Sequence, residues 1–341
     1  MSDIISNFTA LKDNIITNRD NLKSALIDKG INCTDINKIS ELIPKVNELR
    51  GGIPSYMVTK GSWATGCTDK PTATQIHTSS SANGLIYCFG GYDQTKYVQC
   101  YNPSTNTWVK KTNSTVPFVG SVSETVDGLI YCISGYEGSE TNKNRCYNPS
   151  TDTWTAKKTI TNNTAYACSS VVDGLIYVIA GTYNGSAYCL NQCYNPVTDT
   201  WTTQKSIPIS IKKSSASSVN GLIYCYGGID SSDYVNSLTY CYNPSTNTWT
   251  KKTNMYGSAY GIASEVNNNL IYTFGGYATS GSSAVCNYVA SYNPSTDKWT
   301  ELADIPTSRA DLTATNVNGI IYCIGGSDGS DELKKVEAFI P

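Results

Sequence analysis

The sequence predicts a mainly β fold, a six-bladed β-propeller over residues 51–341, preceded by a short α-helical module over residues 1–50. One unit, an apolar Leu-Ile-Tyr-like run after an Asn-Gly-like pair, occurs six times. Five copies continue into a Tyr-Asn-Pro turn followed by a tryptophan, and these tryptophans lie 46, 47, 48 and 50 residues apart. Regular repeats of this length are typical of propeller blades. Residues 1–50 contain none of this pattern.

Each unit predicts four antiparallel strands, which we name a, b, c and d from the inside outward. The paired Asn-Gly or Asp-Gly between two β-rich runs favours a tight a–b hairpin, because such a turn needs positive φ. The six copies of this turn start at Asn83, Asp127, Asp173, Asn220, Asn268 and Asn318. Strand c should end at Tyr-Asn-Pro, and strand d should begin at the tryptophan, which supplies a large face between blades.

The first strand of each unit is made of small residues, such as Thr78-Ser79-Ser80-Ser81. Small polar strands suit the narrow space around a central channel. The sixth copy stops after a c-like strand at 334–339 and has no tryptophan, whereas Trp63 precedes the first blade without a strand b of its own. We therefore expect Trp63 to open strand d of the last blade, so that both chain ends close the ring and leave no unpaired edge.

The paired glycines, Tyr-Asn-Pro and tryptophan, all in register, resemble the kelch repeat, with Tyr-Asn-Pro where Tyr-Asp-Pro is more usual. The resemblance implies a propeller but no single function, since kelch propellers include oxidases, sugar isomerases, adaptors and scaffolds. In kelch adaptors the residue after Gly-Gly helps to line the ligand face. Tyr92, Tyr136 and Tyr277 match that position, whereas the other three copies have Thr182, Ile229 and Ser327.

Residues 1–50 show the spacing of two amphipathic helices. The first has an apolar seam at Ile4, Phe8, Leu11, Ile15, Leu22 and Leu26, interrupted by the polar Asn18 and close to a heptad repeat. Such a seam favours a self-associating mount, giving a homo-oligomer and most simply a trimer; the alternative is a helical hairpin docked on the propeller. The segment also loosely resembles helical modules in tail and baseplate proteins of phages of Gram-positive bacteria.

Composition argues against several partner classes. The formal charge is −2 and no dense Lys/Arg run occurs, so a nucleic-acid partner is not expected. The N-terminus lacks the basic and apolar regions of a signal peptide, and no apolar stretch is long enough to cross a membrane. The 13 cysteines mostly occupy equivalent places in the repeats, where cysteine behaves as a small hydrophobic residue, so we expect reduced thiols.

No catalytic site, metal site or cofactor is expected. The single histidine, His77, is too little for a typical zinc or copper site, and the histidines of the kelch copper oxidases are missing. Glu124 and Glu265 stand at equivalent places on strand a of two blades. Two carboxyl groups facing one channel could perform acid–base chemistry, or bind water or a cation.

The two faces of the propeller differ in sequence. The a–b and c–d turns are nearly identical from blade to blade, whereas the b–c and d–a connections all differ and are rich in Tyr, Ser, Gly, Asn and Asp. That composition is typical of adaptable recognition surfaces and of sugar sites. The d–a connections add Phe118, Lys212 and Lys213. The ligand-binding candidates are Tyr92, Asp93, Tyr136, Tyr166, Tyr183, Asp230, Tyr260, Tyr277, Arg309 and Asp311.

These observations favour a non-enzymatic binding head. The first hypothesis is a receptor-binding protein of a phage or phage-tail-like particle, made in the bacterial cytoplasm, which recognises a host cell-surface glycan or protein. Residues 1–50 would attach it to other tail or baseplate subunits. The alternatives are an intracellular, cytoplasmic protein-binding adaptor, although the long dimerisation module of familiar adaptors is missing, and a sugar-modifying kelch enzyme.

Overall fold

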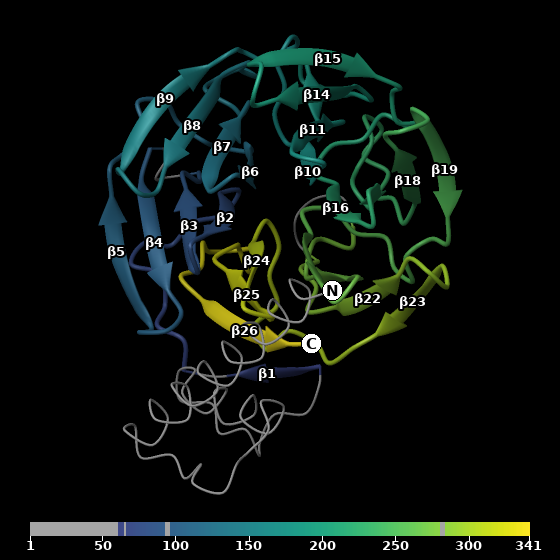
Figure 1. Ribbon diagram of the computed structural model, residues 1–341. Helices are drawn as coiled ribbons and strands as arrows, with labels where there is room; N and C mark the ends of the chain where they lie inside the picture. Colours follow the sequence, from purple (N-terminus) through teal and green to yellow (C-terminus); the bar gives the residue numbers. More distant parts are fainter. Residues whose placement is uncertain (1–60, 65, 93–95, 280–283) are drawn as a thin grey trace, which may run out of the picture. The chain divides into compact units, whose positions relative to one another are not determined.

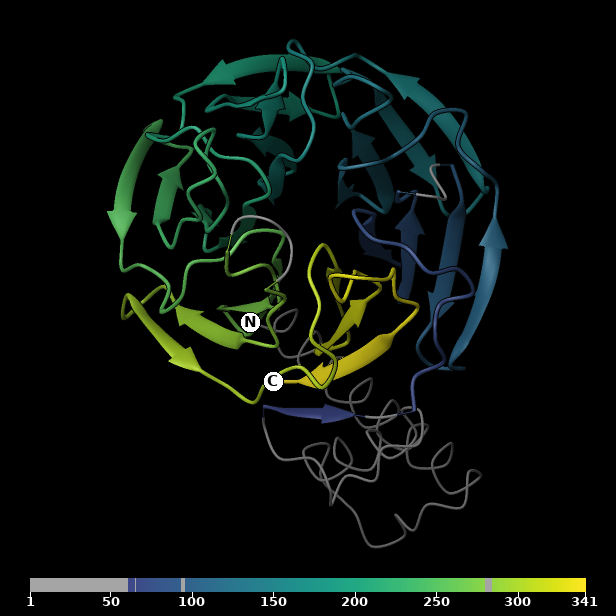
Figure 2. The ribbon, with the colours of Figure 1, turned by 180° about the vertical axis from the view of Figure 1, so that it is seen from behind.

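The computed structural model describes residues 61–64, 66–92, 96–279 and 284–341, which form a ring of six antiparallel sheets (Figures 1 and 2). Each sheet has four strands. The innermost strands contact one another around the ring, and the last, β24, contacts the first, β2. The six-bladed propeller is thus confirmed. Every regular element of the described residues is a strand, and the predicted helices of residues 1–50 lie outside the described residues.

The strands of each blade follow the predicted order from a to d. The first blade has β2 (Thr78–Ala82), β3 (Leu85–Phe89), β4 (Val98–Asn102) and β5 (Thr107–Lys111), and the second has β6 (Val122–Val126), β7 (Leu129–Ile133), β8 (Asn144–Asn148) and β9 (Thr153–Lys157). The third has β10 (Cys168–Val172), β11 (Leu175–Ile179), β14 (Asn191–Asn195) and β15 (Thr200–Gln204), with the small hairpin β12 (Thr182–Tyr183) and β13 (Ser186–Ala187) in its b–c connection.

The remaining three blades repeat this arrangement. The fourth has β16 (Ser215–Val219), β17 (Leu222–Tyr226), β18 (Thr239–Asn243) and β19 (Thr248–Lys252). The fifth has β20 (Ala263–Asn267), β21 (Leu270–Phe274), β22 (Val289–Asn293) and β23 (Lys298–Glu301). The sixth has β24 (Thr313–Val317), β25 (Ile320–Ile324), β26 (Val336–Ile340) and, from the other end of the propeller sequence, β1 (Ser62–Ala64).

Closure of the ring occurs at this sixth blade, as predicted. β1 pairs antiparallel with β26, and Trp63 lies opposite Phe339. The Trp63 ring also packs between blades, with its centroid 5.1 Å from that of Phe339 and 5.8 Å from that of Phe274 in the fifth blade. The outer strand β26 would otherwise expose an unpaired edge, which β1 covers.

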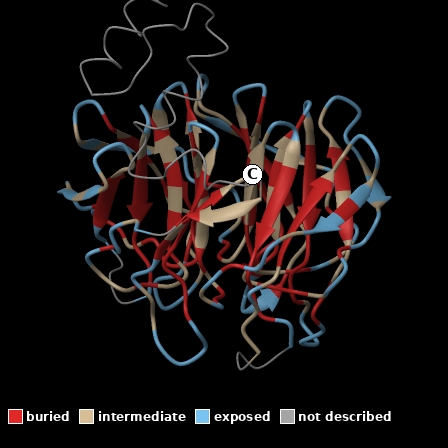
Figure 3. Cartoon of the chain, turned by 90° about the horizontal axis from the view of Figure 1, so that it is seen from below, coloured by how far each residue is buried: buried red, intermediate tan, exposed pale blue. Residues whose placement is uncertain are grey.

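The core lies between blades rather than at the centre of the ring. In the side view of Figure 3, buried residues fill most of the inner strands, and exposed residues lie on outer strands and at the turns and loops of both ends. Strand b supplies most of the buried apolar residues between blades, and these pack against strands b and c of the neighbouring blade. The cysteines at repeated positions are buried in these layers, and the twelve cysteines of the described part are unpaired, as their repeat positions predict.

The tight turns that the sequence predicts have the required backbone. At the first a–b turn Asn83 and Gly84 have φ of 53° and 73°. In the fifth blade, where the glycine is replaced, Asn268 and Asn269 still reach 50° and 61°, because asparagine tolerates this region better than most residues. The paired glycines after strand b are needed for close approach: a Cβ on Gly90 would lie 2.6 Å from the carbonyl oxygen of Phe118 in the next blade.

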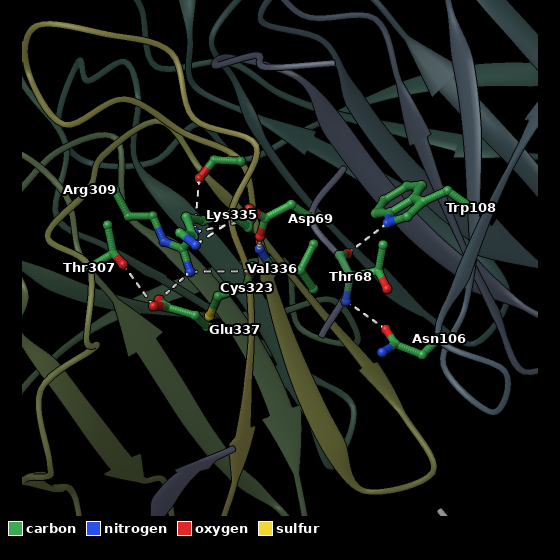
Figure 4. Close-up of polar contacts among 11 residues, drawn as sticks. Thr68, Asp69, Asn106, Trp108, Thr307, Arg309, Cys323, Lys335, Val336 and Glu337 are labelled. Carbon is green, nitrogen blue, oxygen red and sulfur yellow. Dashed lines mark hydrogen bonds and ion pairs between the residues drawn. The ribbon is translucent and has the colours of Figure 1, made fainter. Parts of the chain in front are cut away.

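Neighbouring blades are joined by a two-point clamp that uses the c–d turn. In the first blade Asn106 Oδ1 accepts the Thr68 amide hydrogen at 2.6 Å, and Trp108 Nε1 donates to the Thr68 carbonyl at 2.9 Å (Figure 4). The next four blades make the same two hydrogen bonds to the backbone of one residue each. These are Asp152 and Trp154 to Thr112, Asp199 and Trp201 to Lys158, Asn247 and Trp249 to Lys205, and Asp297 and Trp299 to Thr253. The conserved turn chemistry of the repeat therefore ties each blade to the one before it.

The clamp also explains a difference in the closing blade. In five blades the strand-c tyrosine donates its hydroxyl hydrogen to the clamp Asx, as Tyr147 does to Asp152 at 2.6 Å. The closing blade has Gly61 in place of the Asx and Phe339 in place of the tyrosine. Only the tryptophan half remains, with Trp63 Nε1 donating to the Ala303 carbonyl at 3.0 Å. The tyrosine hydroxyl is thus absent where its acceptor is absent, so no hydroxyl is left without that acceptor.

Candidate functional site

The b–c and d–a connections lie together on one face of the ring, which we call the loop face. Backbone bridges join them, for example Tyr260 with Tyr277 and Ala310 with Ser327. At the centre of this face each d–a connection contributes one residue to a closed ring of backbone hydrogen bonds around the channel, which we call the mouth ring. Its members are Ile76, Gly120, Tyr166, Lys213, Gly261 and Asp311, each donating its N–H to the carbonyl of the preceding member at 2.7–3.1 Å.

All six members of the mouth ring have positive φ, between 51° and 63°. Glycine suits such a position, and Gly120 and Gly261 occupy two of the six. The other four members, Ile76, Tyr166, Lys213 and Asp311, carry larger side chains, which costs conformational energy on the order of 1 kcal/mol each. Backbone strain of this kind is concentrated at functional sites, and three of these four side chains can hydrogen-bond a ligand. Tyr166, Lys213 and Asp311 are therefore the first candidates for a binding site.

The side chains of Tyr166, Lys213 and Asp311 converge. Lys213 Nζ lies 2.9 Å from Asp311 Oδ2 and 5.5 Å from the centre of the Tyr166 ring. It also lies 5.8 and 6.0 Å from the ring centres of Tyr260 and Tyr277, whose own centres are 5.0 Å apart with the ring planes tilted by 30°. An ammonium group in this environment is held by both charge and ring faces. We call Tyr166, Lys213, Tyr260, Tyr277 and Asp311 the mouth cluster.

Two phenols of the mouth cluster, those of Tyr166 and Tyr277, have raised pKa values. Burial raises the pKa of Tyr166 to about 12, and the nearby Asp311 carboxylate adds to the effect. Burial, again with Asp311, raises the pKa of Tyr277 to about 12. Both phenols are therefore protonated near neutral pH, and each can donate and accept hydrogen bonds.

The glycines of the mouth ring make room for the cluster. A Cβ on Gly120 would lie 2.7 Å from the Tyr166 ring, and a Cβ on Gly261 would lie 2.6 Å from Asp311 Oδ1. A shallow cavity of about 120 Å³ opens here, lined by the ring members and by the residues that follow them.

Four of the residues that the sequence predicts as ligand contacts belong to the mouth cluster: Tyr166, Tyr260, Tyr277 and Asp311. Tyr136 adjoins it, with ring centres 6.4 Å from Tyr166. Sequence reasoning places Lys213 in a d–a connection but does not include it in the site. Its alignment with Tyr166 and Asp311 at the same repeat position is the signal that would have identified it.

The other predicted contacts are not members of the mouth cluster. Tyr92 is 60% exposed, and Tyr183 is stacked on Tyr188 at 5.3 Å. Asp230 accepts the amide hydrogens of Ser232 and Tyr234, so its carboxylate holds its own loop. Asp93 lies outside the described residues.

Arg309 requires a correction. The sequence predicts it as a ligand contact, but its side chain is fully buried in the sixth blade. Its guanidinium donates to Glu337 at 2.7 Å and to the carbonyls of Cys323, Gly325 and Lys335 (Figure 4). Its place in a variable d–a connection suggested exposure, yet its donors are directed inward at strands b and c of the same blade.

Exposed tyrosines lie on the loop face in the b–c connections of the first four blades. The b–c connections carry the members of this set, which we call the tyrosine rim: Tyr92, Tyr97, Tyr136, Tyr183 and Tyr234. Their exposed fractions run from 37% to 65%. Tyrosine offers a large rigid contact area at low entropic cost, and these rings have no folding role that requires exposure.

Below the mouth, a channel of about 420 Å³ is lined by strand a of every blade and is rich in serine and threonine. It contains Glu124 and Glu265, as predicted. Ser169 Oγ donates to Glu124 at 2.6 Å, and the amides of Val266 and Asn316 donate to Glu265. Burial raises the pKa of Glu265, and it raises the pKa of Glu124 to about 7, with a smaller contribution from the Glu265 charge.

The raised pKa of Glu124 predicts a pH-dependent stability. Between about pH 4.5 and pH 7 the folded state retains a proton that the unfolded chain has released, so this carboxyl group lowers stability as the pH rises through that window. Glu124→Gln should therefore gain about 1–2 kcal/mol relative to wild type from pH 4.5 to 7, since channel water screens part of the burial. Denaturant titrations at several pH values measure it, and a constant difference between the two proteins would contradict it.

His77 is buried beside the mouth, and its Nε2 lies 3.2 Å from Thr313 Oγ1. Burial lowers its pKa well below the usual range, so the ring is neutral. Within the described ranges no group of three or more His, Cys, Asp or Glu side chains could hold a metal ion. No helix among these residues is long and apolar enough to cross a membrane.

Comparison with known proteins supports the repeat assignment. The family model described as the Kelch motif matches residues 77–114, 117–158, 163–207, 213–256, 258–306 and 308–341. No curated protein matches the sequence. The chain is similar to a solved structure described as "Structure of YjhT", with 14% identity and a TM-score of 0.70 over 79% of this chain and 95% of that chain. At that identity the similarity shows the fold alone.

Proposed function

Because the chain belongs to the kelch-repeat family, whose fold supports unrelated functions, we propose its function from the loop face: a non-enzymatic binding head that recognises a cell-surface carbohydrate. The observation that carries the proposal is the mouth cluster, in which strained backbone positions bring Tyr166, Lys213 and Asp311 together beside exposed tyrosines. Sugars stack on ring faces through their C–H groups and hydrogen-bond through their hydroxyls, and the loop face offers both kinds of contact.

The biological setting is part of the proposal. The seam of residues 1–50 and its resemblance to phage modules support a receptor-binding protein of a phage tail or tail-like particle, assembled in the bacterial cytoplasm. In this setting residues 1–50 hold copies of the chain together and attach them to other tail or baseplate subunits. Light scattering of the purified full chain should give an oligomer, with a trimer expected. A monomer at micromolar concentration would count against the attachment role.

A glycan array probed with the full-length protein tests the recognition role. We expect binding to a limited set of glycans, and Tyr136→Ala should weaken it by about 1–3 kcal/mol, as expected for an aromatic anchor. Val197→Ser is the matched control, because Val197 is 88% exposed in a c–d turn on the opposite face. It should bind like wild type. Absence of any glycan binding, combined with capture of a protein partner by the loop face, would favour the adaptor alternative instead.

A further inference from the structure

We propose that Lys213 and Asp311 form a subsite for a vicinal diol of a neutral, terminal sugar unit. This inference rests on the proposed carbohydrate-binding function and adds the chemical class of the ligand. It depends on unused hydrogen-bonding capacity, local charge balance and the size of the cavity at the mouth of the channel.

The hydrogen-bonding capacity of the pair is only partly used. The Lys213 ammonium carries three N–H donors, and its one hydrogen bond in the described part of the chain goes to Asp311 Oδ2. The same bond is the only one found there for the Asp311 carboxylate, which has a second oxygen and further lone pairs. The pair therefore presents free donors and free acceptors side by side.

A vicinal diol complements this arrangement. One hydroxyl oxygen can accept a hydrogen bond from the Lys213 ammonium, while the adjacent hydroxyl donates to the Asp311 carboxylate. Both bonds are charge-assisted, which makes them stronger and more direction-dependent than bonds between neutral groups. A ligand with a single hydroxyl at this place would satisfy only one member of the pair and leave the other partly desolvated.

The local charge favours a neutral ligand. Lys213 and Asp311 are 2.9 Å apart, so their charges largely cancel. The Asp311 side chain is only 7% exposed, and a carboxylated sugar would bring a second negative charge against it. Two like charges at short range in a partly desolvated site oppose binding.

The cavity favours a terminal unit. Its volume of about 120 Å³ is smaller than the roughly 300–1,000 Å³ of pockets that enclose a whole small molecule. One edge of a pyranose ring fits into it while the rest of the glycan remains outside. The Tyr166 ring lies beside the ammonium, and Tyr136 continues the aromatic surface outward, so the next sugar unit has a ring to stack on.

The experiment is calorimetry or saturation-transfer NMR of the full-length protein with methyl glycosides of the common neutral hexoses and of sialic and uronic acids. At least one neutral glycoside should bind, and its monodeoxy analogue, which lacks one hydroxyl of the diol, should bind about 10-fold or more weakly. Lys213→Met and Asp311→Asn should each weaken the neutral glycoside by a similar factor. Lys212→Met is the matched control, because the adjacent lysine lies outside the cluster, and it should leave affinity unchanged.

Thermal melting of each variant shows whether the ring is intact. The mouth ring is held by backbone bonds, so both variants should keep the wild-type fold. If array glycans bind and depend on Tyr136 but not on Lys213 or Asp311, the subsite is wrong and the recognition role stands. A preference for carboxylated sugars that rises in Asp311→Asn would overturn the neutral class. If no carbohydrate binds wild type at all, the proposed function itself is contradicted.

Discussion

A chain shortened by residues 334–341 should lose the cooperative stability of the whole ring. This deletion removes β26, which is the central link between β25 and β1 in the closing blade. Val336, Ala338 and Phe339 on this strand are buried, and losing a buried phenylalanine side chain alone costs about 3–5 kcal/mol. The deletion also exposes the edges of β25 and β1, so we expect a loss of at least about 5 kcal/mol, comparable to the whole stability of many domains.

Two variants keep this prediction measurable if the shortened chain does not fold. Phe339→Ala should lower the free energy of unfolding by about 3–5 kcal/mol, because its ring packs against Trp63, Tyr272 and Phe274. Val197→Ser, which replaces an apolar side chain at an exposed position, should stay within about 0.5 kcal/mol of wild type. A shortened chain that melts within about 2 °C of the full chain would show that β26 and β1 do not close the ring.

Arg309→Met should destabilise the fold strongly and affect ligand recognition only through folding. The substitution leaves Glu337, 13% exposed, without its cation and removes the donors to three backbone carbonyls. Breaking a buried ion pair from one side costs about 3–5 kcal/mol, because the remaining charge stays partly buried. Denaturant unfolding measures the loss.

The partner substitution supplies the control. In the double variant Arg309→Met with Glu337→Met no uncompensated charge remains, so we expect it to be no less stable than Arg309→Met alone, with a coupling energy of about 1–3 kcal/mol. Thr307 also donates to Glu337, so part of the carboxylate's interaction survives in the single variant. A single variant within about 0.5 kcal/mol of wild type would show that the buried Arg309–Glu337 ion pair does not stabilise the fold.

The sequence predicts the architecture of the ring well because the same local chemistry is repeated. Asn83-Gly84 and its equivalents need positive φ, and the structure has it at every a–b turn. The pairing of Trp63 with the last blade also follows from the sequence. The sixth copy has no strand d, and the segment around Trp63 has no other blade, so this segment supplies the missing strand. These features depend on backbone conformation and on which segments can pair.

The candidate site is predicted only in part, because it depends on side-chain direction in irregular segments. Tyr166 and Asp311 were identifiable as polar or aromatic residues in variable connections. The same reasoning selected Arg309, although its guanidinium points into the blade, and passed over Lys213, although its ammonium lies at the centre of the cluster. Residue type in a loop does not determine which way the side chain points, whereas the repeat position does: the mouth-ring alignment separates Lys213 from Arg309.

The account's central claim is that ligands bind at the mouth of the channel on the loop face. A crystal structure of the protein with the best glycan from the array tests it most directly. We expect the terminal sugar to contact Lys213 and Asp311, with the remaining units stacked on Tyr136 or on other tyrosines of the rim. A glycan bound on the opposite face, against the a–b and c–d turns, with the mouth cluster free of ligand, would contradict it.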